Sequence, residues 1–378
     1  HELPQKYKGI QDVCRKFCDN ELKPVAGELD KSRKFPQEQI QKLGEMGFMG
    51  LLVSKNHGGS ERDMLSAAIA VEELSRGCAS TGAIVSIHNI LYANFLDCFG
   101  NDNQKKTFLE PYIKGVPGAF ALSEAEAGSD VSNISTTATN RGNKFILNGE
   151  KTWVTSAYEA EIGIIFATID KSMKHKGLGA FIIPLNSKGV KRGKPEKKMG
   201  IRATSTCSLY LSDVEVPAEN LVGSLGDGFR MAMEQLNKAR IGISSQAVGI
   251  AQACLDTALE YATNRRAFGK SLVDFQGVQL KLAEMATRIE AARMLVWKAA
   301  SMCDKNENFI LNSSMAKLFA GKTATYCAHE CVQILGGMGY VEDMPAERYY
   351  RDARITEIYG GVSDIQKLII TDQLVRTK

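Results

Sequence analysis

Residues 145–155 read FILNGEKTWVT, and they mark the point at which the chain changes from helical to strand-like patterning. β-Branched and aromatic residues on both sides of Asn148-Gly149 are typical of a hairpin, because Asn-Gly favours a type I′ turn. Further strand-like runs follow at residues 164–169, 180–184 and 207–214. Strands without helices between them predict an antiparallel sheet or a small barrel.

Helical periodicity surrounds this region on both sides. Apolar residues recur at helical spacing before residue 118, and Phe229–Arg265 is an unusually long pattern of the same kind. Two more long helices are predicted at residues 275–302 and 310–335, and long helices joined by short loops predict an antiparallel four-helix bundle. The fold class is therefore α+β with three domains: an N-terminal helical domain (1–118), a middle antiparallel β-barrel or sheet domain (119–225) and a C-terminal four-helix bundle (226–378).

Composition limits the classes of function. A formal net charge of +4 over 378 residues predicts neither nucleic acid nor a membrane surface as an obligate partner. The sequence has no apolar run of about 18 residues, so no transmembrane helix is expected. The nine cysteines are odd in number and form no CxxC pair, which predicts reduced thiols. No metal site is expected, since His329 points away from the helix face shared by Cys327 and Cys331.

Four short motifs can carry chemistry, and each also has an ordinary structural interpretation. FALSEAEAGSD at Phe120–Asp130 either brings backbone amides to a planar or anionic ligand or forms a polar loop. The glycines of QILGGMGY at Gln333–Tyr340 follow a helix, so they either admit a ligand or end that helix. Arg265 closes the long helix, where a cation is favoured and where it could also bind phosphate. Arg351–Arg354 is either functional or a surface run of ion pairs.

Taken together and in order, these segments resemble the acyl-CoA dehydrogenase family over essentially the whole chain. FALSEAEAGSD is similar to the family's A-L-[ST]-E-P-x-x-G-S-D motif, and Trp153–Ala157 is similar to W-I-[ST]-[NS]-[AGS]. QILGGMGY and YRDARITEIY (Tyr350–Tyr359) nearly match family motifs. Residues 72–82, 200–207 and 240–246 indicate the short-chain or short/branched-chain branch.

The resemblance implies a homotetrameric flavoprotein, a dimer of dimers, that uses FAD. It implies α,β-dehydrogenation of short or short/branched acyl-CoA thioesters, with electrons passing to electron-transfer flavoprotein. Such enzymes serve fatty acid β-oxidation or branched-chain amino acid catabolism in the mitochondrial matrix, although this chain carries no recognisable targeting segment. In the family a carboxylate removes the α-proton while a hydride passes to the flavin, which supplies the difficult chemistry.

The site residues that the resemblance implies are spread along the middle and C-terminal domains. The cofactor-binding residues are Phe120, Ala121, Leu122, Ser123, Gly128, Ser129, Trp153, Val154, Thr155, Arg265, Gln276, Gln333, Ile334, Leu335, Gly336, Gly337, Val362, Ser363 and Asp364. The substrate-binding residues are Ser129, Asn237, Arg240, Gly360 and Gly361. Within these sets, Arg265 and Gln276 are expected at the phosphates and adenosine end, and Gln333–Gly337 at FAD bound mainly to the partner subunit.

The family's catalytic base is missing from its usual position. The short-chain branch reads I-Y-E-G-T-S-E-I-Q with the first Glu as base, whereas residues 358–366 here read IYGGVSDIQ and place Gly360 there. The other location that the family uses, in an L-x-x-E-R context, is Ala239 here. Val362 replaces a threonine common in the family, which removes one possible hydrogen bond to FAD. We expect Gly360 to keep the N–H that polarises the thioester and to leave a small space beside the substrate.

Three interpretations of this departure stay open. The chain is an acyl-CoA dehydrogenase altered to lose its base, a natural relative that binds acyl-CoA and FAD or acts as a structural subunit, or an active enzyme whose base lies elsewhere. Glu357 and Asp364 lie close in sequence, but they match family positions that are not the base. Loss of a general base costs about 10²–10⁴-fold, so impaired activity is predicted.

Overall fold

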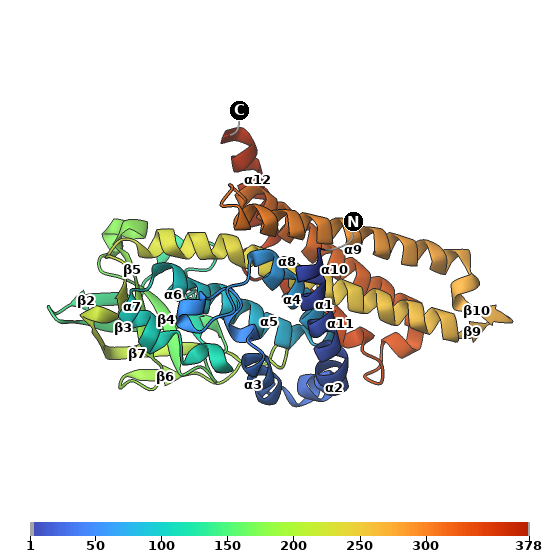
Figure 1. The fold of residues 1–378 in the computed structure, drawn as a ribbon, viewed down its shortest axis with the longest axis horizontal. Helices are drawn as coiled ribbons and strands as arrows, with labels where there is room; N and C mark the ends of the chain where they lie inside the picture. Colours follow the sequence, from blue (N-terminus) through green and yellow to red (C-terminus); the bar gives the residue numbers. More distant parts are fainter. Residues whose placement is uncertain (1–3, 377–378) are drawn as a thin grey trace.

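A computed structural model describes residues 4–376, so the first three and last two residues of the predicted terminal domains lie outside the described residues. Figure 1 shows an elongated molecule with the strands at one end and long helices that run from the sheet to the opposite end. The N-terminal helices pack against the middle of this length. Among residues 4–376, no helix is long and apolar enough to cross a lipid bilayer.

The N-terminal part contains seven α-helices. They are α1 (Gln5–Phe17), α2 (Lys23–Ser32), α3 (Gln37–Glu45), α4 (Met64–Gly77), α5 (Ala79–Ile87), α6 (Asn94–Phe99) and α7 (Asp102–Phe108). Asp63 begins α4, because its carboxylate accepts a hydrogen bond from the Ser66 backbone N–H at 2.9 Å. Asn101 begins α7 through a capping box with Gln104. These caps supply partners for helix-end N–H groups that the helix itself leaves unpaired.

The middle part is a mixed sheet that is antiparallel at most of its pairings. Its strands are β1 (Ala119–Ala121), β2 (Thr137–Asn140), β3 (Lys144–Thr155), β4 (Ile162–Thr168), β5 (Leu178–Pro184), β6 (Val190–Arg192), β7 (Thr206–Pro217) and β8 (Leu221–Val222). The order is β6-β7-β3-β2-β4-β5-β8, with β1 also paired with β4. Only the β1–β4 and β2–β4 pairings in this sheet are parallel.

The predicted hairpin at Asn148-Gly149 is wrong. Both residues lie inside β3, a single strand of 12 residues that pairs along its length with β7. A register irregularity falls between Leu147 and Gly149, and the Asn148 side-chain amide exchanges two hydrogen bonds with Asp213. Cross-strand pairing along the whole strand outweighs the local turn preference, so Asn-Gly forms a bulge here. The turn that enters β3 lies at Gly142, where φ is +82°.

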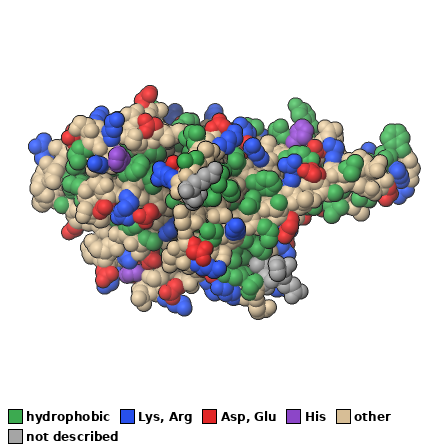
Figure 2. Space-filling model, turned by 90° about the horizontal axis from the view of Figure 1, so that it is seen from above, with side chains coloured by type: hydrophobic (Ala, Val, Ile, Leu, Met, Phe, Trp, Pro, Cys, Tyr) green, Lys and Arg blue, Asp and Glu red, His purple; other side chains and the backbone are tan. Residues whose placement is uncertain are grey.

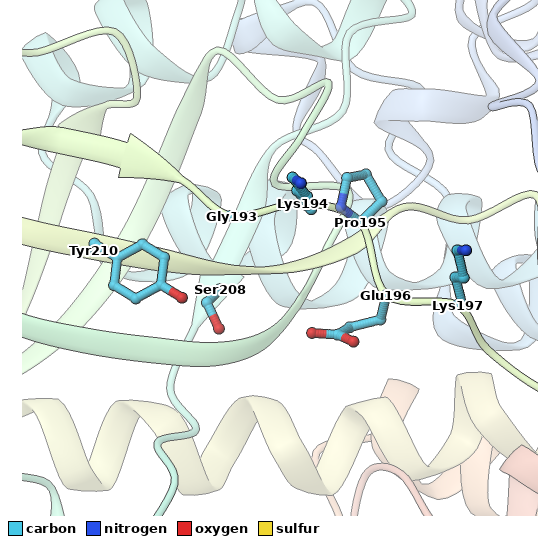
Figure 3. Close-up of a pocket in the computed structure, with 7 residues that line it drawn as sticks. All are labelled: Gly193, Lys194, Pro195, Glu196, Lys197, Ser208 and Tyr210. Atoms are coloured by element: carbon cyan, nitrogen blue, oxygen red, sulfur yellow. The ribbon is translucent and has the colours of Figure 1, made fainter.

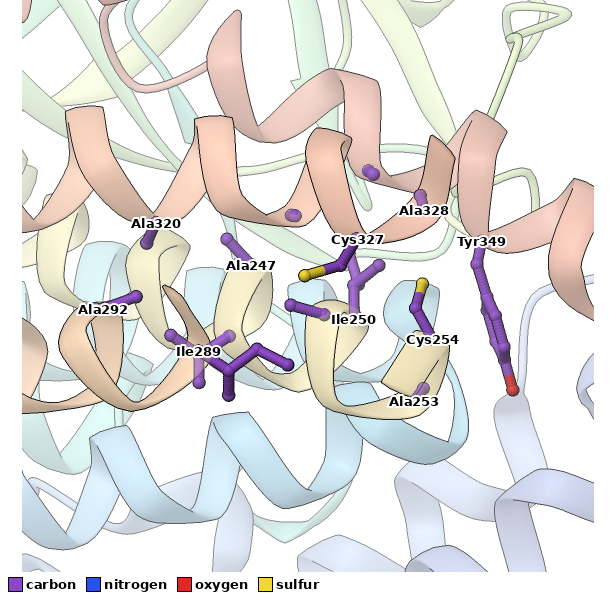
Figure 4. Packing of buried hydrophobic residues seen from close by; sticks show 14 of the residues in the cluster. Ala247, Ile250, Ala253, Cys254, Ile289, Ala292, Ala320, Cys327, Ala328 and Tyr349 are labelled. Carbon is purple, nitrogen blue, oxygen red and sulfur yellow. The ribbon is translucent and has the colours of Figure 1, made fainter. Parts of the chain in front are cut away.

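The C-terminal part confirms the three long helices. They are α8 (Gly228–Asn264), α9 (Gln276–Asp304) and α10 (Ile310–Leu335), and the short pair β9 (Arg266–Ala267) and β10 (Lys270–Ser271) lies between the first two. The shorter α11 (Ala346–Ala353) and α12 (Ser363–Arg376) pack on α10. Figure 4 shows why the helices approach closely, because small buried residues such as Ala247, Cys254 and Ala320 line their contact.

The Arg351–Arg354 segment joins the three parts of the chain. Arg351 forms an ion pair with Asp30 of α2 at 2.7 Å, and Asp352 accepts a hydrogen bond from the Ile201 backbone N–H at 2.5 Å. Burial raises the pKa of the Asp352 carboxyl to about 6. Because Asp352 is buried, this segment connects parts of the interior. It is therefore more than a run of ion pairs on the surface.

Candidate active site

A buried ion pair holds the FALSEAEAGSD loop against β3. The Lys151 ammonium donates to the Glu124 carboxylate at 2.7 Å and to the Leu122 carbonyl at 3.1 Å. The same carboxylate accepts backbone N–H groups of Ser135 at 2.6 Å and Thr136 at 3.0 Å. Burial opposes ionisation of Glu124, yet the Lys151 charge and these donors lower its pKa to about 2. These contacts fix the loop against β3, while Gly128 and Ser129 of the same loop are exposed.

Trp153 stands beside this loop with its ring exposed. The residue has φ of +58° at a register irregularity between Lys151 and Val154, and its side chain is 66% exposed. Val154 points into the sheet core and is buried, so the irregularity turns Trp153 outward. An exposed aromatic ring next to open backbone suits a planar cofactor such as a flavin.

A second group of predicted FAD-binding residues lies at the far end of the helical bundle. Arg265 follows α8, Gln276 begins α9 and Gln333 lies in the last turn of α10. An ion pair between Lys281 and Glu330 keeps the ends of α9 and α10 together. Gly336 ends α10 with φ of +59°, and a Cβ added there or at Gly337 would meet no atom within 4 Å. The glycines thus end the helix and also leave backbone open to a ligand.

One chain does not bring the two groups together. The length of α8 separates them. The part of this helix from Arg240 to Arg265 alone spans roughly 40 Å, because an α-helix rises 1.5 Å per residue. Figure 1 shows the sheet and the β9–β10 turn at opposite ends of the molecule. The structure therefore places the predicted FAD-binding residues in two separate groups at opposite ends of one chain.

The position of the missing base lies in the middle of the molecule, between α8 and α10. Gly360 has φ of +64°, and a Cβ added to it would clash with Cδ1 of Ile243. The prediction of a small empty space beside Gly360 is therefore wrong, because the Ile243 side chain occupies it. Lys317 of α10 reaches this loop and donates from Nζ to the Gly361 carbonyl at 2.5 Å.

Two residues of α8 that the sequence predicts to line the substrate path, Asn237 and Arg240, lie close to each other. Arg240 is buried, and one of its Nη atoms donates to the Asn237 side-chain oxygen at 2.5 Å, while its buried Nε has no hydrogen-bond partner among the described residues. Burial lowers the pKa of Arg240 to about 10. The pKa of Lys317 is lowered to about 8, mainly by burial and secondly by the charge of Arg240. The helix pattern alone gave no reason to select Lys317 or Ile243, since both lie within long helices.

The carboxylates nearest in sequence have other partners. Glu357 accepts a hydrogen bond from the Thr325 hydroxyl at 2.5 Å and pairs with Arg354 at 2.9 Å. Asp364 is exposed and pairs with Lys367 at 2.7 Å, which lowers its pKa. Ala239 is buried and carries no functional group. The local structure therefore identifies no replacement carboxylate among these residues.

A surface hollow lies away from the predicted site. It has a volume of about 530 Å³ and is lined by residues 193–197 together with Ser208 and Tyr210. Figure 3 shows these side chains around the edge formed by β6 and β7 and the loop that follows β6. None of the predicted site residues lines it, so its size does not identify it as the reaction site.

Comparisons with known proteins identify the family. Three sequence models, described as the acyl-CoA dehydrogenase N-terminal, middle and C-terminal domains, match residues 4–116, 119–214 and 226–375. The chain is 48% identical to the mitochondrial short-chain specific acyl-CoA dehydrogenase of Rattus norvegicus, over 100% of this chain and 92% of the relative.

Solved structures extend the similarity to the fold. Butyryl-CoA dehydrogenase from Megasphaera elsdenii has a TM-score of 0.97 at 39% identity and covers 100% of both chains. PigA, solved with FAD and proline, has a TM-score of 0.96 at 26% identity and covers 100% of this chain and 99% of that one. FAD is the cofactor of this family, and the exposed Trp153 and open glycine backbone described above fit it. The chain belongs to the acyl-CoA dehydrogenase family, and within it resembles the short-chain, butyryl-CoA dehydrogenase-like members.

Proposed function

We propose that this protein binds FAD and a short or short/branched acyl-CoA thioester, and that its α,β-dehydrogenation is impaired because Gly360 supplies no base. The observation that carries the proposal is the loop at Gly360. Gly360 has no carboxylate, and those of Glu357 and Asp364 are bound to other residues. Loss of a general base lowers the rate by about 10²–10⁴-fold. Bound FAD supplies the hydride acceptor, and the chain supplies orientation and polarisation.

The residues have distinct parts in this proposal. The tip of the FALSEAEAGSD loop and Trp153–Thr155 bind the flavin of one subunit, and Arg265, Gln276 and Gln333–Gly337 bind its far end from a second subunit. The residues that line the acyl-CoA path are Ser129, Asn237, Arg240, Gly360 and Gly361. Those that follow in the same loop and contact FAD are Val362, Ser363 and Asp364. The backbone N–H of Gly360 remains available to polarise the thioester carbonyl.

A homotetramer is part of the same proposal. The split of the predicted FAD site between two ends of the chain requires at least a second copy. The narrow end of the molecule also exposes hydrophobic side chains, as Figure 2 shows, and Phe268 and Leu280 there are 96% and 65% exposed. Exposed apolar residues of this kind are typical of surfaces that another chain covers. Electron-transfer flavoprotein is the proposed acceptor of any electrons released, and the mitochondrial matrix the proposed location, in agreement with the mammalian relatives.

Two other functions remain as alternatives with their own signatures. A non-catalytic subunit would bind FAD and acyl-CoA without any reduction of the flavin, or would bind neither. An active dehydrogenase with a base elsewhere would reduce its flavin without any change at position 360. The loop around Gly360, whose nearest carboxylates in sequence are engaged elsewhere, favours impaired or absent chemistry over this last possibility.

The decisive experiment follows the visible spectrum of the flavin anaerobically after adding a short or a 2-methyl-branched acyl-CoA. The unaltered chain is expected to shift its spectrum on binding but to bleach slowly. Gly360→Glu combined with Ile243→Ala is expected to bleach about 10²–10⁴-fold faster, because it adds the carboxylate and removes the side chain that clashes with it. Ile243→Ala alone is the matched control. Rapid bleaching of the unaltered chain would show that a base exists elsewhere.

A further inference from the structure

Two buried cations flank the Gly360–Gly361 loop without an acidic partner of their own. Arg240 is 8% exposed and Lys317 is 2% exposed. Among residues 4–376, the hydrogen bonds of these two cationic groups go to the Asn237 amide oxygen and the Gly361 carbonyl, and the Nε of Arg240 has none. Both partners are neutral, so neither hydrogen bond places an opposite charge beside these cations.

Uncompensated charge of this kind is unusual inside a protein. Buried Lys and Arg are almost always paired, because removing a charge from water is costly unless an opposite charge replaces the solvent. The acidic residue that acts on Lys317 is Glu357, and its carboxylate is already engaged by Thr325 and Arg354. Arg240 and Lys317 also repel each other, since the charge of Arg240 lowers the pKa of Lys317. An anion near them would stabilise both.

The free atom of Arg240 indicates which anion fits. The Nε lies on the edge of the guanidinium group that can form two parallel hydrogen bonds with a carboxylate. A planar carboxylate matches this fork, while the Asn237 oxygen occupies a different nitrogen. Ile243, one turn further along α8, is buried and apolar, so it offers no competing acceptor.

We infer that Arg240 and Lys317 form, beside Gly360, a binding subsite for a carboxylate group that the chain itself does not supply. The inference rests on the proposed function, because Arg240 and Gly360 are taken to line the acyl-CoA path. The carboxylate comes either from the acyl part of an acid-bearing acyl-CoA or from a small free carboxylate. In both cases the ligand restores the negative charge that this region lacks.

The first test titrates the FAD-loaded protein with sodium formate and sodium acetate at pH 7, against sodium chloride at equal ionic strength. The readouts are the flavin absorbance and the thermal unfolding midpoint. We expect a saturable response to the carboxylates, weakened about thirtyfold or more by Arg240→Gln or by Lys317→Met. Arg288→Gln, which removes a half-exposed arginine on α9, is the matched control and should leave binding unchanged. Arg240→Lys should retain part of the affinity.

The Gly360→Glu/Ile243→Ala variant gives an internal check. Its added carboxylate should occupy the subsite, so formate and acetate should no longer produce the saturable response. Retention of the full response in this variant, or an unchanged affinity in both Arg240→Gln and Lys317→Met, would overturn the inference.

The second test separates the two sources of the carboxylate. Succinyl-CoA and butyryl-CoA carry acyl chains of the same length, and only succinyl-CoA ends in a carboxylate. Tighter binding of succinyl-CoA that is lost in Arg240→Gln assigns the subsite to the acyl-CoA, whereas an Arg240-dependent response to formate alone assigns it to a free carboxylate. If neither ligand shows an Arg240-dependent effect while FAD and butyryl-CoA still bind, the subsite is refuted and the proposed function stands. If the unaltered chain binds no FAD, the proposed function itself fails.

Discussion

Two buried lysines of this protein differ in one respect, which is the presence of a carboxylate. Lys151 under the FALSEAEAGSD loop is fully buried and paired with Glu124 at 2.7 Å. Lys317 under the Gly360–Gly361 loop is 2% exposed and hydrogen-bonded to a neutral carbonyl. Burial lowers the pKa of both ammonium groups to about 8, but the Glu124 charge opposes this shift at Lys151, whereas the Arg240 charge adds to it at Lys317.

This difference matches the proposed function, in which the site lacks its base while the residues around it are kept. At Lys151 every charge has a partner, and the region holds a loop that the proposed flavin site requires. At Lys317 and Arg240 the positive charges remain while the acidic position is glycine. Removing either partner of a buried ion pair lowers stability, because it leaves one charge unpaired. At the unpaired site, the proposed carboxylate ligand would supply the missing partner.

The largest effect is expected when the paired site is broken. Glu124→Gln should leave the Lys151 charge buried and alone, and should lower the free energy of unfolding by about 3–5 kcal/mol. The measurement is urea unfolding at pH 7. Lys151→Met combined with Glu124→Gln should recover much of this loss, because no buried charge is then left unpaired. Equal losses in the single and double variants would contradict the importance of the pair.

Acid should reveal part of the same stabilisation. The pKa of Glu124 in the folded protein is lowered from its ordinary value of 4.5 to about 2. A depressed carboxyl pKa gives stability that is present above pH 4.5 and is lost as the pH falls toward 2. Urea midpoints measured between pH 5 and pH 3 should therefore fall more steeply in the unaltered chain than in the Lys151→Met/Glu124→Gln variant. Parallel curves would show that Glu124 does not contribute.

A smaller loss is expected at the loop of the unpaired site. Gly360→Ala places a side chain at φ of +64° and against Ile243, and should lower the free energy of unfolding by about 2 kcal/mol. Gly9→Ala is a matched control, because Gly9 lies within α1 and a Cβ there meets no atom within 4 Å. That control should be neutral or stabilising. Adding Ile243→Val to Gly360→Ala should reduce the steric part of the loss.

The smallest effect is expected when an unpaired cation is removed. Arg240→Gln leaves no carboxylate without its partner, so the free energy of unfolding should change by less than about 1 kcal/mol, and it can increase. Urea unfolding without added carboxylates provides the measurement. A loss as large as that of Glu124→Gln would show that Arg240 has a structural partner, and the contrast between the two sites would not hold.

Much of the architecture follows from the sequence because it depends on local patterns. The apolar repeats of α8, α9 and α10 fix helices whose observed ends lie within two residues of the expected ones. The change to β-branched runs predicts the middle sheet, and the motifs identify the family. The glycine at position 360 is also visible directly, since the residues around it match the family's motif without a gap.

Other features depend on residues that meet only when the chain folds. Asn148-Gly149 has the local signature of a turn, yet pairing with β7 keeps it within one strand. Ile243 and Lys317 reach the Gly360 loop from α8 and α10, and no pattern near residue 360 predicts either contact. The site assignments themselves remain predictions.

The sequence by itself determined the three long helices, the change to a middle sheet, the family and the glycine at position 360, because these are properties of residues and their neighbours along the chain. Only the tertiary structure decided that Ile243 fills the expected space, that the predicted FAD residues fall at two ends of the molecule, and that two cations are buried without an acid. The physical reason is that packing and electrostatic balance depend on distances between segments far apart in sequence.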